Sequence, residues 1–443
     1  MLKKWFKKLI SSGKTAPPQA RVQEYLYSEH KIARSQLSFA AEKVIKRLQE
    51  KGFEAYVVGG AVRDLLLGKE PKDFDVATNA SPEEVRKLFR RSRIIGRRFK
   101  IVHVMVGPET IEVTTFRGGS STSQNEHGRI MKDNSFGSQA EDASRRDFTC
   151  NALYYNPENQ KITDYYRGFS DVKAKKLVII GQAVERFQED PVRILRAIRL
   201  CAKLGFSLEK RTQTAITECT HLLNKEPPAR LFDELLKLLL CGYARKCIQS
   251  LQEYNLVATE VFPLLKFVLG EHQDNPFAQL ILKNTDERLQ NNKHVSIGFI
   301  LAALLWQPVY LVWQNNIQQG QKGVPALIGA MNDVQDSLDR RFAVPRRFSS
   351  MMREIWMMQP QFEARTGSRP FRLLAQARFR AAYDFMLVRV QVGELPQELA
   401  DWWTRFQAVD EEEKKQMISQ VRPPATKTGR RRRVHRRKPA QSA

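Results

Sequence analysis

Two aspartates, Asp73 and Asp75, stand two positions apart in the stretch DFDVAT (73–78). The pattern of this stretch predicts a β-strand, and residues i and i+2 of a strand project from the same face. Two carboxylates on one face provide the hard oxygen ligands that Mg²⁺ prefers, in a site of the two-metal type that joins protein to nucleotide phosphates. The alternative is an exposed strand end with two solvated acids.

Gly59 and Gly60 lie upstream, between two elements of different periodicity. The run 54–58 predicts a buried strand, and 61–68 predicts a short helix. Peptide N–H groups at the start of a helix can seat a phosphate, and Arg63 would add a fixed positive fork. A plain tight turn is the alternative for the two glycines alone, but the paired aspartates downstream favour a phosphate site.

Metal sites of this kind usually use a third carboxylate, and the sequence offers two candidates. Glu112 lies in TIEVTTF (110–116), a strand that could neighbour the DFDVAT strand, and its alternative role is a half-buried edge acid. Asp147 lies in RRDFTCNALYY (145–155), where it could instead cap a helix or form a salt bridge. We keep both, and expect Asp147 to be either catalytic or organising.

The elements that must position these residues form an α+β head. A helix is expected from Ser35 to Gly52, followed by the strands and helices above and by an apparent hairpin of 100–107 with 110–116. Residues 118–144 are rich in Gly, Ser and Asn and predict a long mobile loop. From about residue 170 strand signals almost disappear. Amphipathic segments then predict an all-helical remainder, at 190–204, 229–240, 294–306 and 372–391.

The charge balance points to a polyanionic partner. The 443 residues hold 73 Lys and Arg against 48 Asp and Glu, a net charge of +25. Residues 1–14 and 422–443 contain no acid. We expect a flexible basic leader over 1–34, with a short interfacial helix as the alternative. The tail over 422–443 should be disordered and bind RNA backbone, or merely add solubility.

The cysteine pattern and the hydropathy of the chain indicate the cellular compartment in which the protein is expected. The five cysteines form no C-x-x-C pair, so neither a disulfide framework nor a zinc site is indicated. We find neither a secretory apolar stretch nor an apolar run long enough to span a membrane. We therefore expect a cytoplasmic protein without stable membrane insertion, with weak peripheral association through the leader as the alternative.

Four ordered motifs carry a family resemblance: GGAVRD (59–64), KDFDVATNA (72–80), RRDFTCNALYY and EDPVRILRAIR (189–199). Together they resemble the branch of the nucleotidyltransferase superfamily that holds bacterial poly(A) polymerases and bacterial CCA-adding tRNA nucleotidyltransferases. Downstream stretches such as 227–239, 344–348 and 371–385, and the Arg-rich tail, resemble the polymerase side. The resemblance covers about residues 35–405.

The resemblance implies roles for individual residues. Asp73 and Asp75 would be metal ligands, and Asp147 would match an active-site position. The triphosphate of ATP would be held by Gly59, Gly60, Arg63 and Arg146, and the incoming nucleotide would meet Asp190, Arg193 and Arg196. The implied organisation is a catalytic head (35–165), a helical neck (166–245) that binds nucleobase and RNA, and a helical RNA-binding body (246–421).

The proposed base contact agrees with hydrogen-bonding chemistry. Adenine offers a donor followed by an acceptor, which the Asp190 carboxylate and the Arg193 guanidinium would complement. Cytosine offers the same order, whereas guanine and uracil reverse it, so this pair admits A and C without separating them. Asp190 followed by Pro191 is also a good helix N-cap, and both roles could coexist.

The expected function is template-independent addition of AMP from ATP to RNA 3′ ends. The partners would be mRNA, small RNAs and decay intermediates, together with RNA-decay proteins. A CCA-adding enzyme is the alternative within the same class. A non-catalytic RNA-binding protein is the alternative from another class, but it leaves the glycine pair and the paired aspartates unexplained.

Overall fold

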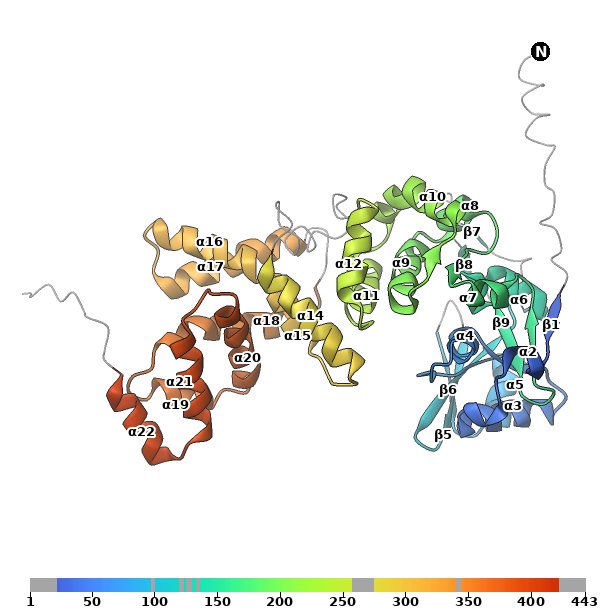
Figure 1. Ribbon diagram of the computed structural model, residues 1–443, viewed down its shortest axis with the longest axis horizontal. Helices are drawn as coiled ribbons and strands as arrows, with labels where there is room; N and C mark the ends of the chain where they lie inside the picture. Colours follow the sequence, from blue (N-terminus) through green and yellow to red (C-terminus); the bar gives the residue numbers. More distant parts are fainter. Residues whose placement is uncertain are drawn as a thin grey trace, which may run out of the picture. The chain divides into compact units, whose positions relative to one another are not determined.

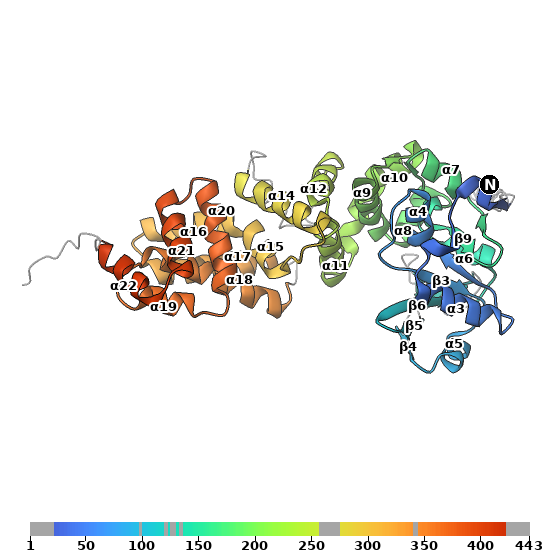
Figure 2. The same ribbon diagram turned by 60° about the horizontal axis from the view of Figure 1, so that its bottom comes forward.

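The computed structural model describes residues 22–96, 100–118, 136–256, 275–339 and 344–421, and the backbone alone of 123–124 and 130–132. The chain divides into two compact units (Figures 1 and 2). The first consists of Met1–Lys266, Leu282–His294 and Leu338–Ala343, and the second of Phe267–Ile281, Val295–Ser337 and Val344–Ala443. The expected class is confirmed, because the first unit contains a mixed sheet with helices and the described part of the second is helical. The tail lies outside the described residues.

One eight-stranded sheet organises the head, in the order β1-β10-β9-β2-β3-β6-β5-β4. Strands β3 and β6 run parallel, and the other neighbours run antiparallel. The predicted strand at 54–58 is β2, and the predicted hairpin is β5 with β6. The strands are β1 (Gln23–Tyr25), β2 (Ala55–Val58), β3 (Asp75–Thr78), β4 (Ser92–Ile95), β5 (Ile101–Val106), β6 (Glu109–Thr115), β9 (Leu153–Asn156) and β10 (Lys161–Asp164).

Two helices pack on the sheet and on each other. Helix α3 (Phe39–Gln49) begins after Ser38, whose hydroxyl accepts from the Ala41 N–H, and it buries its apolar stripe against β2, β3 and β6. Helix α5 (Pro82–Leu88) has the predicted start, because the Ser81 hydroxyl accepts from the Glu84 N–H. Residues 34–36 form a separate 3₁₀ turn, so the helix expected from Ser35 begins later.

Residues 22–34 are not a flexible leader. Strand β1 pairs with β10 at the edge of the sheet, and helix α2 (Tyr27–His30) follows it. Ile32 is buried, and the His30 ring accepts the Ile32 N–H through Nδ1. Local charge and proline content did not reveal this edge strand because its pairing partner lies about 140 residues away in sequence. Residues 1–21 lie outside the described part.

The stretch 118–144 is also not simply a loop. Helix α6 (Gln139–Arg145) occupies its end and begins with a capping box of Ser138 and Glu141. That S-x-x-E spacing was the available sequence signal, hidden by the surrounding glycines and serines. Two short strands, β7 (Ser123–Gln124) and β8 (Ile130–Lys132), pair with each other. The remaining positions between them lie outside the described residues.

The neck follows the head within the first unit. Its helices are α7 (Gly168–Lys173), α8 (Ala183–Glu189), α9 (Val192–Leu204), α10 (Lys210–Cys219), α11 (Pro228–Leu239) and α12 (Ala244–Glu253). The predicted segments 190–204 and 229–240 correspond to α9 and α11. Two-residue strands β11 (Lys176–Leu177) and β12 (Ser207–Leu208) pair in parallel. Helix α9 packs against α11 and α12, which turns one of its faces toward the head.

The described part of the second unit is built from helices. They are α14 (Pro276–Gln290, which has residues in both units), α15 (Ile297–Leu304), α16 (Trp306–Gln318), α17 (Gly323–Asp339), α18 (Arg346–Met358), α19 (Arg369–Leu374), α20 (Phe379–Gln391), α21 (Gln397–Ala408) and α22 (Glu411–Gln420). The predicted segment 372–391 is two helices, because the chain turns between α19 and α20 and the Phe379 N–H donates to the Gln376 carbonyl. Phe379, Tyr383 and Trp403 are buried core residues.

No single described helix is long and apolar enough to cross a bilayer. Helices α15 and α16 together have the length and apolar composition of a membrane-spanning helix, but the pair is bent by 50°.

Candidate active site

A pocket of about 680 Å³ lies in the first unit between the head and neck helix α9. Its lining brings together nine of the predicted site residues: Gly59, Gly60, Arg63, Asp75, Arg146, Asp147, Asp190, Arg193 and Arg196. Asp73 and Glu112 are absent from this lining, but both raise the pKa of Asp75 and therefore lie close to it. Residues from four separate motifs thus surround one polar cavity.

The glycine pair connects β2 to helix α4 (Gly60–Leu66). Gly59 has φ 75° and ψ −127°, a conformation that is essentially restricted to glycine. A Cβ at Gly59 would lie 3.4 Å from Nη1 of Arg146, and one at Gly60 would lie 3.4 Å from Nη2 of Arg63. The absence of side chains therefore lets two guanidinium groups approach the backbone at the start of α4.

Arg63 is held in place by two partners. Its Nη1 donates to Oδ1 of Asn151 at 2.6 Å, and its Nη2 lies 2.8 Å from Oδ1 of Asp64. Arg63 is buried except for its face on the pocket. Asn151 also donates to Asp147, so one amide orients two site residues of opposite charge.

The carboxylates gather where β3 begins. Asp75 and Glu112 are register partners on the parallel strands β3 and β6. Asp73 is exposed and precedes β3, so the predicted strand begins two residues later than expected. Burial, reinforced by Glu112 and Asp73, raises the pKa of Asp75 to about 6 although Arg146 opposes the shift. Burial and neighbouring negative charges both disfavour the ionised form of Asp75.

The carboxylates at the start of β3 suit a cation whose remaining ligands come from the bound substrate and from water. Within the described residues, no three His, Cys, Asp or Glu side chains are gathered closely enough to hold a metal by themselves. Mg²⁺ in nucleotide-dependent enzymes typically takes one or two carboxylates, with phosphate oxygens and water filling the other positions. Asp73 and Asp75 fit that arrangement.

Glu112 and Asp147 differ in how many hydrogen bonds their carboxylate oxygens already accept. Oε1 of Glu112 lies 3.2 Å from Nε2 of His103, and about half of the Glu112 side chain is exposed. Asp147 is buried: Oδ1 accepts from the Phe148 N–H and from Asn151, and Oδ2 accepts from Nε and Nη2 of Arg196. Burial alone would raise the pKa of Asp147, but Arg196, Asn151 and the Phe148 N–H hold it at about 2.

Arg146 is fixed by residues that the sequence did not indicate. Its Nε and Nη2 donate to Oδ2 of Asp142, and its Nε also reaches the Tyr154 hydroxyl at 3.0 Å. The Tyr154 hydroxyl donates to the same Asp142 oxygen at 2.6 Å. Asp142 lies within the stretch expected to be a loop, and Tyr154 belongs to an apolar strand. The spacing of four residues between Asp142 and Arg146 was the available sequence signal. Tyr154 has no local signal for this role.

The two predicted base-contact residues are each held by a neighbour. Oδ1 and Oδ2 of Asp190 lie 2.8 and 2.9 Å from Nη2 of Arg230, which reaches across from α11. Arg193 is bound by Glu189 at 3.0 Å and by the Arg186 carbonyl at 2.7 Å. The N-cap of α9 is Pro191, one residue later than predicted, although the Asp190 carboxylate still accepts from the Val192 N–H. Sequence reasoning missed Arg230.

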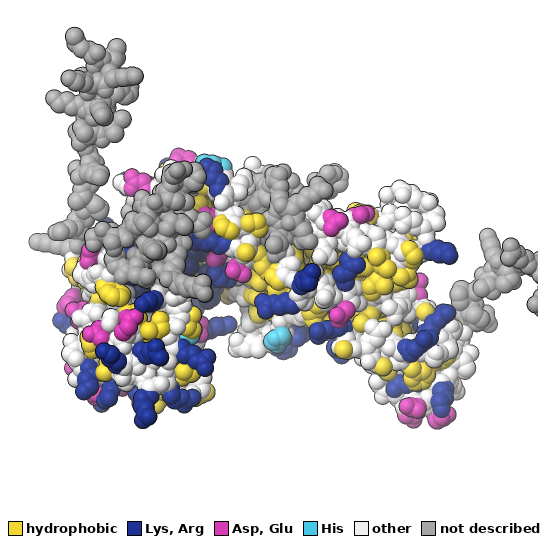
Figure 3. Space-filling model, turned by 180° about the vertical axis from the view of Figure 1, so that it is seen from behind, with side chains coloured by type: hydrophobic (Ala, Val, Ile, Leu, Met, Phe, Trp, Pro, Cys, Tyr) yellow, Lys and Arg dark blue, Asp and Glu magenta, His cyan; other side chains and the backbone are white. Residues whose placement is uncertain are grey.

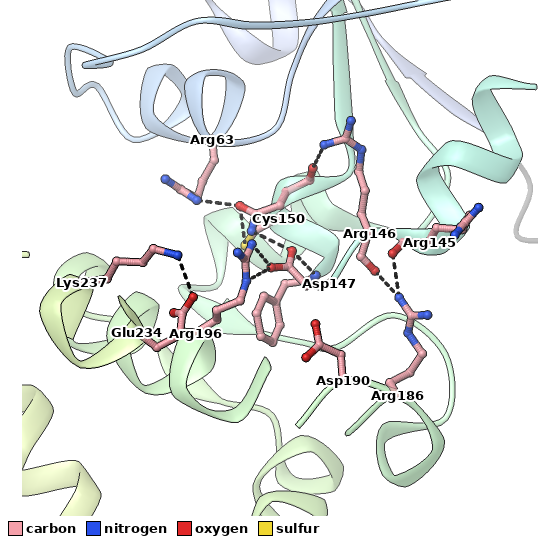
Figure 4. A network of polar contacts seen from close by, with 12 residues as sticks. Arg63, Arg145, Arg146, Asp147, Cys150, Arg186, Asp190, Arg196, Glu234 and Lys237 are labelled. Carbon is pink, nitrogen blue, oxygen red and sulfur yellow. Dashed lines mark hydrogen bonds and ion pairs between the residues drawn. The ribbon is translucent and has the colours of Figure 1, made fainter. Parts of the chain in front are cut away.

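Arg186 ties the neck to the head beside this site. Its Nη2 donates to the carbonyl oxygens of Arg145 and Arg146, as Figure 4 shows. Its Nη1 pairs with Glu189 at 2.6 Å, and Glu189 in turn holds Arg193. The RRD segment and the start of α9 are therefore joined by both Arg186 and the Asp147–Arg196 pair.

Comparison with known proteins places this pocket in a family. A model of the poly A polymerase head domain matches residues 55–178, and a model of the polymerase A arginine-rich C-terminus matches 319–438. Poly(A) polymerase I of Escherichia coli O6:H1 is 44% identical over 426 residues, which cover 93% of this chain and 91% of that protein. The chain belongs to the poly(A) polymerase family. Poly(A) polymerase I of Salmonella typhi is 42% identical over 98% of this chain and 97% of its own length.

These matches confirm the resemblance found in the sequence and favour the poly(A) polymerase branch over the CCA-adding branch. The CCA-adding enzyme of Lactococcus lactis is 42% identical over only 45% of this chain and 50% of its own length. A further model, of a probable RNA- and SrmB-binding site of polymerase A, matches 205–268. The CCA-adding enzyme of Bacillus stearothermophilus, solved with CTP, shares the fold with a TM-score of 0.56 at 24% identity, over 87% of this chain and 89% of that one.

Proposed function

We propose that the pocket adds AMP from ATP to RNA 3′ ends without a template. The observation that carries the proposal is the convergence of Asp75 at the start of β3, the glycine pair and the α9 arginines on one cavity. In this reaction the RNA 3′-hydroxyl attacks the α-phosphorus of ATP, the bond to the β-phosphate oxygen breaks, and pyrophosphate leaves. The hydroxyl proton passes to solvent or to a carboxylate.

The chain's own residues have distinct parts in this proposal. The Gly60 N–H and the guanidinium groups of Arg63 and Arg146 receive the triphosphate, whose charge the two guanidinium groups neutralise. The Gly59 N–H donates to the Leu153 carbonyl at 3.3 Å, so Gly59 contributes the side-chain-free space beside the phosphates. Mg²⁺, held by Asp73 and Asp75, would lower the pKa of the attacking hydroxyl and stabilise the negative charge that develops. Of the two candidates for a third carboxylate, Glu112 is favoured because every oxygen lone pair direction of Asp147 is already engaged.

Asp147 is instead a positioning residue. It fixes Arg196 and, through Asn151, Arg63, so the phosphate side and the base side of the pocket move together. On the base side, Asp190 accepts from the adenine amino group and Arg193 donates to the ring nitrogen. Arg230 keeps the Asp190 carboxylate in place for this contact.

The substrates and surroundings follow from the same proposal. The RNA partners are mRNA, small RNAs and decay intermediates, with RNA-decay proteins as associates and the cytoplasm as the compartment. A probable RNA-binding segment at 205–268 supports RNA as the polymer. A related CCA-adding enzyme solved with ATP, at a TM-score of 0.54 and 19% identity, supports the fold alone.

An Asp73→Ala, Asp75→Ala double variant tests the catalytic assignment. It should lose essentially all AMP incorporation while retaining RNA binding, because the carboxylates act on the metal and the phosphates. A matched double variant, Glu54→Ala with Glu158→Ala, removes two exposed carboxylates outside the pocket and should keep wild-type activity. Full activity of the Asp73/Asp75 variant would overturn the assignment.

A further inference from the structure

A second groove lies on the head, outside the catalytic pocket. It has a volume of about 630 Å³ and lies where α3 and the end of α5 meet strand β5. Its rim carries the cations Lys43, Lys46, Arg47, Arg90 and Arg91, with Glu50 as the one acid in its lining. Its apolar floor is formed by Leu88, Phe89, Val104, Met105 and Val106.

The groove cations are largely unpaired. The side chains of Lys46, Arg90 and Arg91 make no hydrogen bond or ion pair with the described residues, and all three are exposed. Arg47 approaches Glu50 only at 4.0 Å, with both side chains half exposed, a geometry that contributes little. Figure 3 shows Lys and Arg side chains gathered over the part of the head that holds these elements. The groove is therefore a concentrated positive field with an apolar base.

An unpacked aromatic ring extends this surface. Phe39, in the first turn of α3, is 74% exposed, and Nζ of Lys43 lies 5.7 Å from its ring centre. Phe39, Lys43, Lys46 and Arg47 share the outer face of α3, because helical residues three and four apart are neighbours. A phenylalanine so exposed contributes nothing to the core of the head. Cations interleaved with available aromatic rings are the combination that binds single-stranded nucleic acid.

Protection of a sheet edge explains only part of this charge. Strand β4 is the edge of the sheet, and basic residues on edge strands prevent unwanted strand pairing. That device accounts for Arg93 on β4 and for Arg91 directly before it. It does not account for the cations and the exposed phenylalanine on α3, because α3 is a helix and not an edge strand.

Strand register connects the groove to the catalytic carboxylates. Asp75, Glu112, His103 and Arg93 are successive register partners across β3, β6, β5 and β4. The groove residues Val104 to Gly107 continue along β5 from His103, and four residues span about 13 Å at roughly 3.3 Å per residue. The groove lies on the α3 side of the sheet, whereas Asp75, Glu112 and His103 project from the other side. The β5–β6 turn at Gly107 also lies at the end of the sheet where Asp73 precedes β3. A polymer whose end is held at the carboxylates can reach the groove around this end of the sheet.

We propose that this groove, with Phe39, binds the RNA backbone on the 5′ side of the 3′ end that is being extended. RNA is the occupant because its polyanionic backbone complements the unpaired cations and a base can stack on the exposed ring of Phe39. The proposal rests on the proposed function for the identity of the polymer. It adds an RNA contact in the head, outside the segments 205–268 and 319–438.

The test uses the full-length protein and two matched triple variants. The groove variant is Lys43→Gln, Lys46→Gln, Arg47→Gln. The control, Lys31→Gln, Lys51→Gln, Lys69→Gln, removes the same charge from exposed positions that line neither the groove nor the catalytic pocket. RNA affinity is measured by fluorescence anisotropy without ATP, as a function of salt, for a 25-nucleotide RNA and for a trinucleotide.

The groove variant should bind the long RNA about tenfold more weakly, and its salt slope should fall by about 2, as expected for three lost single-strand contacts. The control and the trinucleotide should show neither effect. Phe39→Ala should weaken binding of long RNA without lowering stability, because the ring is exposed. Equal losses in the two triple variants would overturn the proposal. These binding measurements decide it even if no AMP is incorporated, so its failure is distinguishable from failure of the proposed function.

Discussion

Two nitrogens of Arg196, Nε and Nη2, donate to the same oxygen of Asp147, Oδ2. Arg196 lies on neck helix α9 and Asp147 lies in the head, so the pair joins the neck to the head beside the pocket. The other oxygen of Asp147 is occupied by Asn151 and by the Phe148 N–H. A charged pair that is this fully hydrogen-bonded is strongly destabilising to break.

Asp147→Asn should therefore lower the free energy of unfolding by about 3 kcal/mol at pH 7. The pKa of Asp147, about 2, lies below the ordinary 3.8, so the pair stabilises the protein above pH 4 and loses its contribution as the pH falls through 2. Urea unfolding of the two proteins measures the difference. Glu354→Gln breaks the exposed pair with Arg378 and should cost less than about 1 kcal/mol. Equal costs for both variants would show that Asp147 is not a structural anchor.

Asp75→Asn should abolish AMP incorporation and yet stabilise the metal-free protein at pH 7. The pKa of Asp75 is raised to about 6, so the folded state loses stability as the pH rises from about 4 through 6. Removing the charge should recover about 1–3 kcal/mol at pH 7 and nothing at pH 4. Urea unfolding in EDTA at both pH values provides the measurement. A variant less stable than the wild type at pH 7 would mean that burial and the neighbouring carboxylates do not disfavour the ionised form of Asp75.

Arg230→Gln should reduce discrimination between ATP and GTP. Loss of its two contacts frees the Asp190 carboxylate, and a lost charge-assisted hydrogen bond of about 1.5–3 kcal/mol corresponds to roughly a tenfold or larger rise in KM for ATP. Steady-state kinetics with each nucleotide measures this. Glu226→Gln is the control, since Glu226 accepts from Nη1 of Arg230 at 2.8 Å and leaves the Nη2 contacts to Asp190 in place. If Glu226→Gln changes the nucleotide preference as much, Arg230 does not act through Asp190.

Gly59→Ala should impair ATP binding beyond its cost in stability. The backbone at Gly59 is strained for any other residue, and the new Cβ would press on Arg146 at 3.4 Å. Gly52→Ala introduces a side chain at a comparable φ of 82° with nothing within 4 Å. Both should lose about 1–3 kcal/mol of stability, but only Gly59→Ala should weaken ATP binding in calorimetry. Similar ATP affinity in both variants would mean that the glycine pair does not form part of the phosphate site.

The sequence predicted the parts of the site whose chemistry is local. Gly59 and Gly60 stand between a strand and a helix, and the paired aspartates and the α9 arginines have regular spacing, so these motifs could be recognised in the sequence. The residues that hold these groups in place could not be recognised in the same way. Tyr154 and Arg230 act through contacts that depend on how separate elements pack, so their neighbours in sequence do not indicate these contacts. Asp142 has a local signal, its spacing of four residues from Arg146, but it lies in a stretch whose composition is typical of loops.

The same distinction applies to the fold. Strands β2, β5 and β6 and the capped helix α5 were predicted because hydrophobic alternation and capping residues are local signals. Strand β1 was missed because three residues that pair with a distant strand have no periodicity to detect. Helix α6 was missed because its capping box lies in a polar stretch whose composition is typical of loops.

The most direct test of the central claim is incubation of the purified protein and Mg²⁺ with one labelled nucleoside triphosphate at a time. One substrate is a generic RNA 3′ end, and the other is tRNA lacking its terminal nucleotides. We predict long ladders from ATP alone on the generic RNA, with little incorporation from CTP, GTP or UTP. Short additions of C and then A that are confined to tRNA would contradict the account.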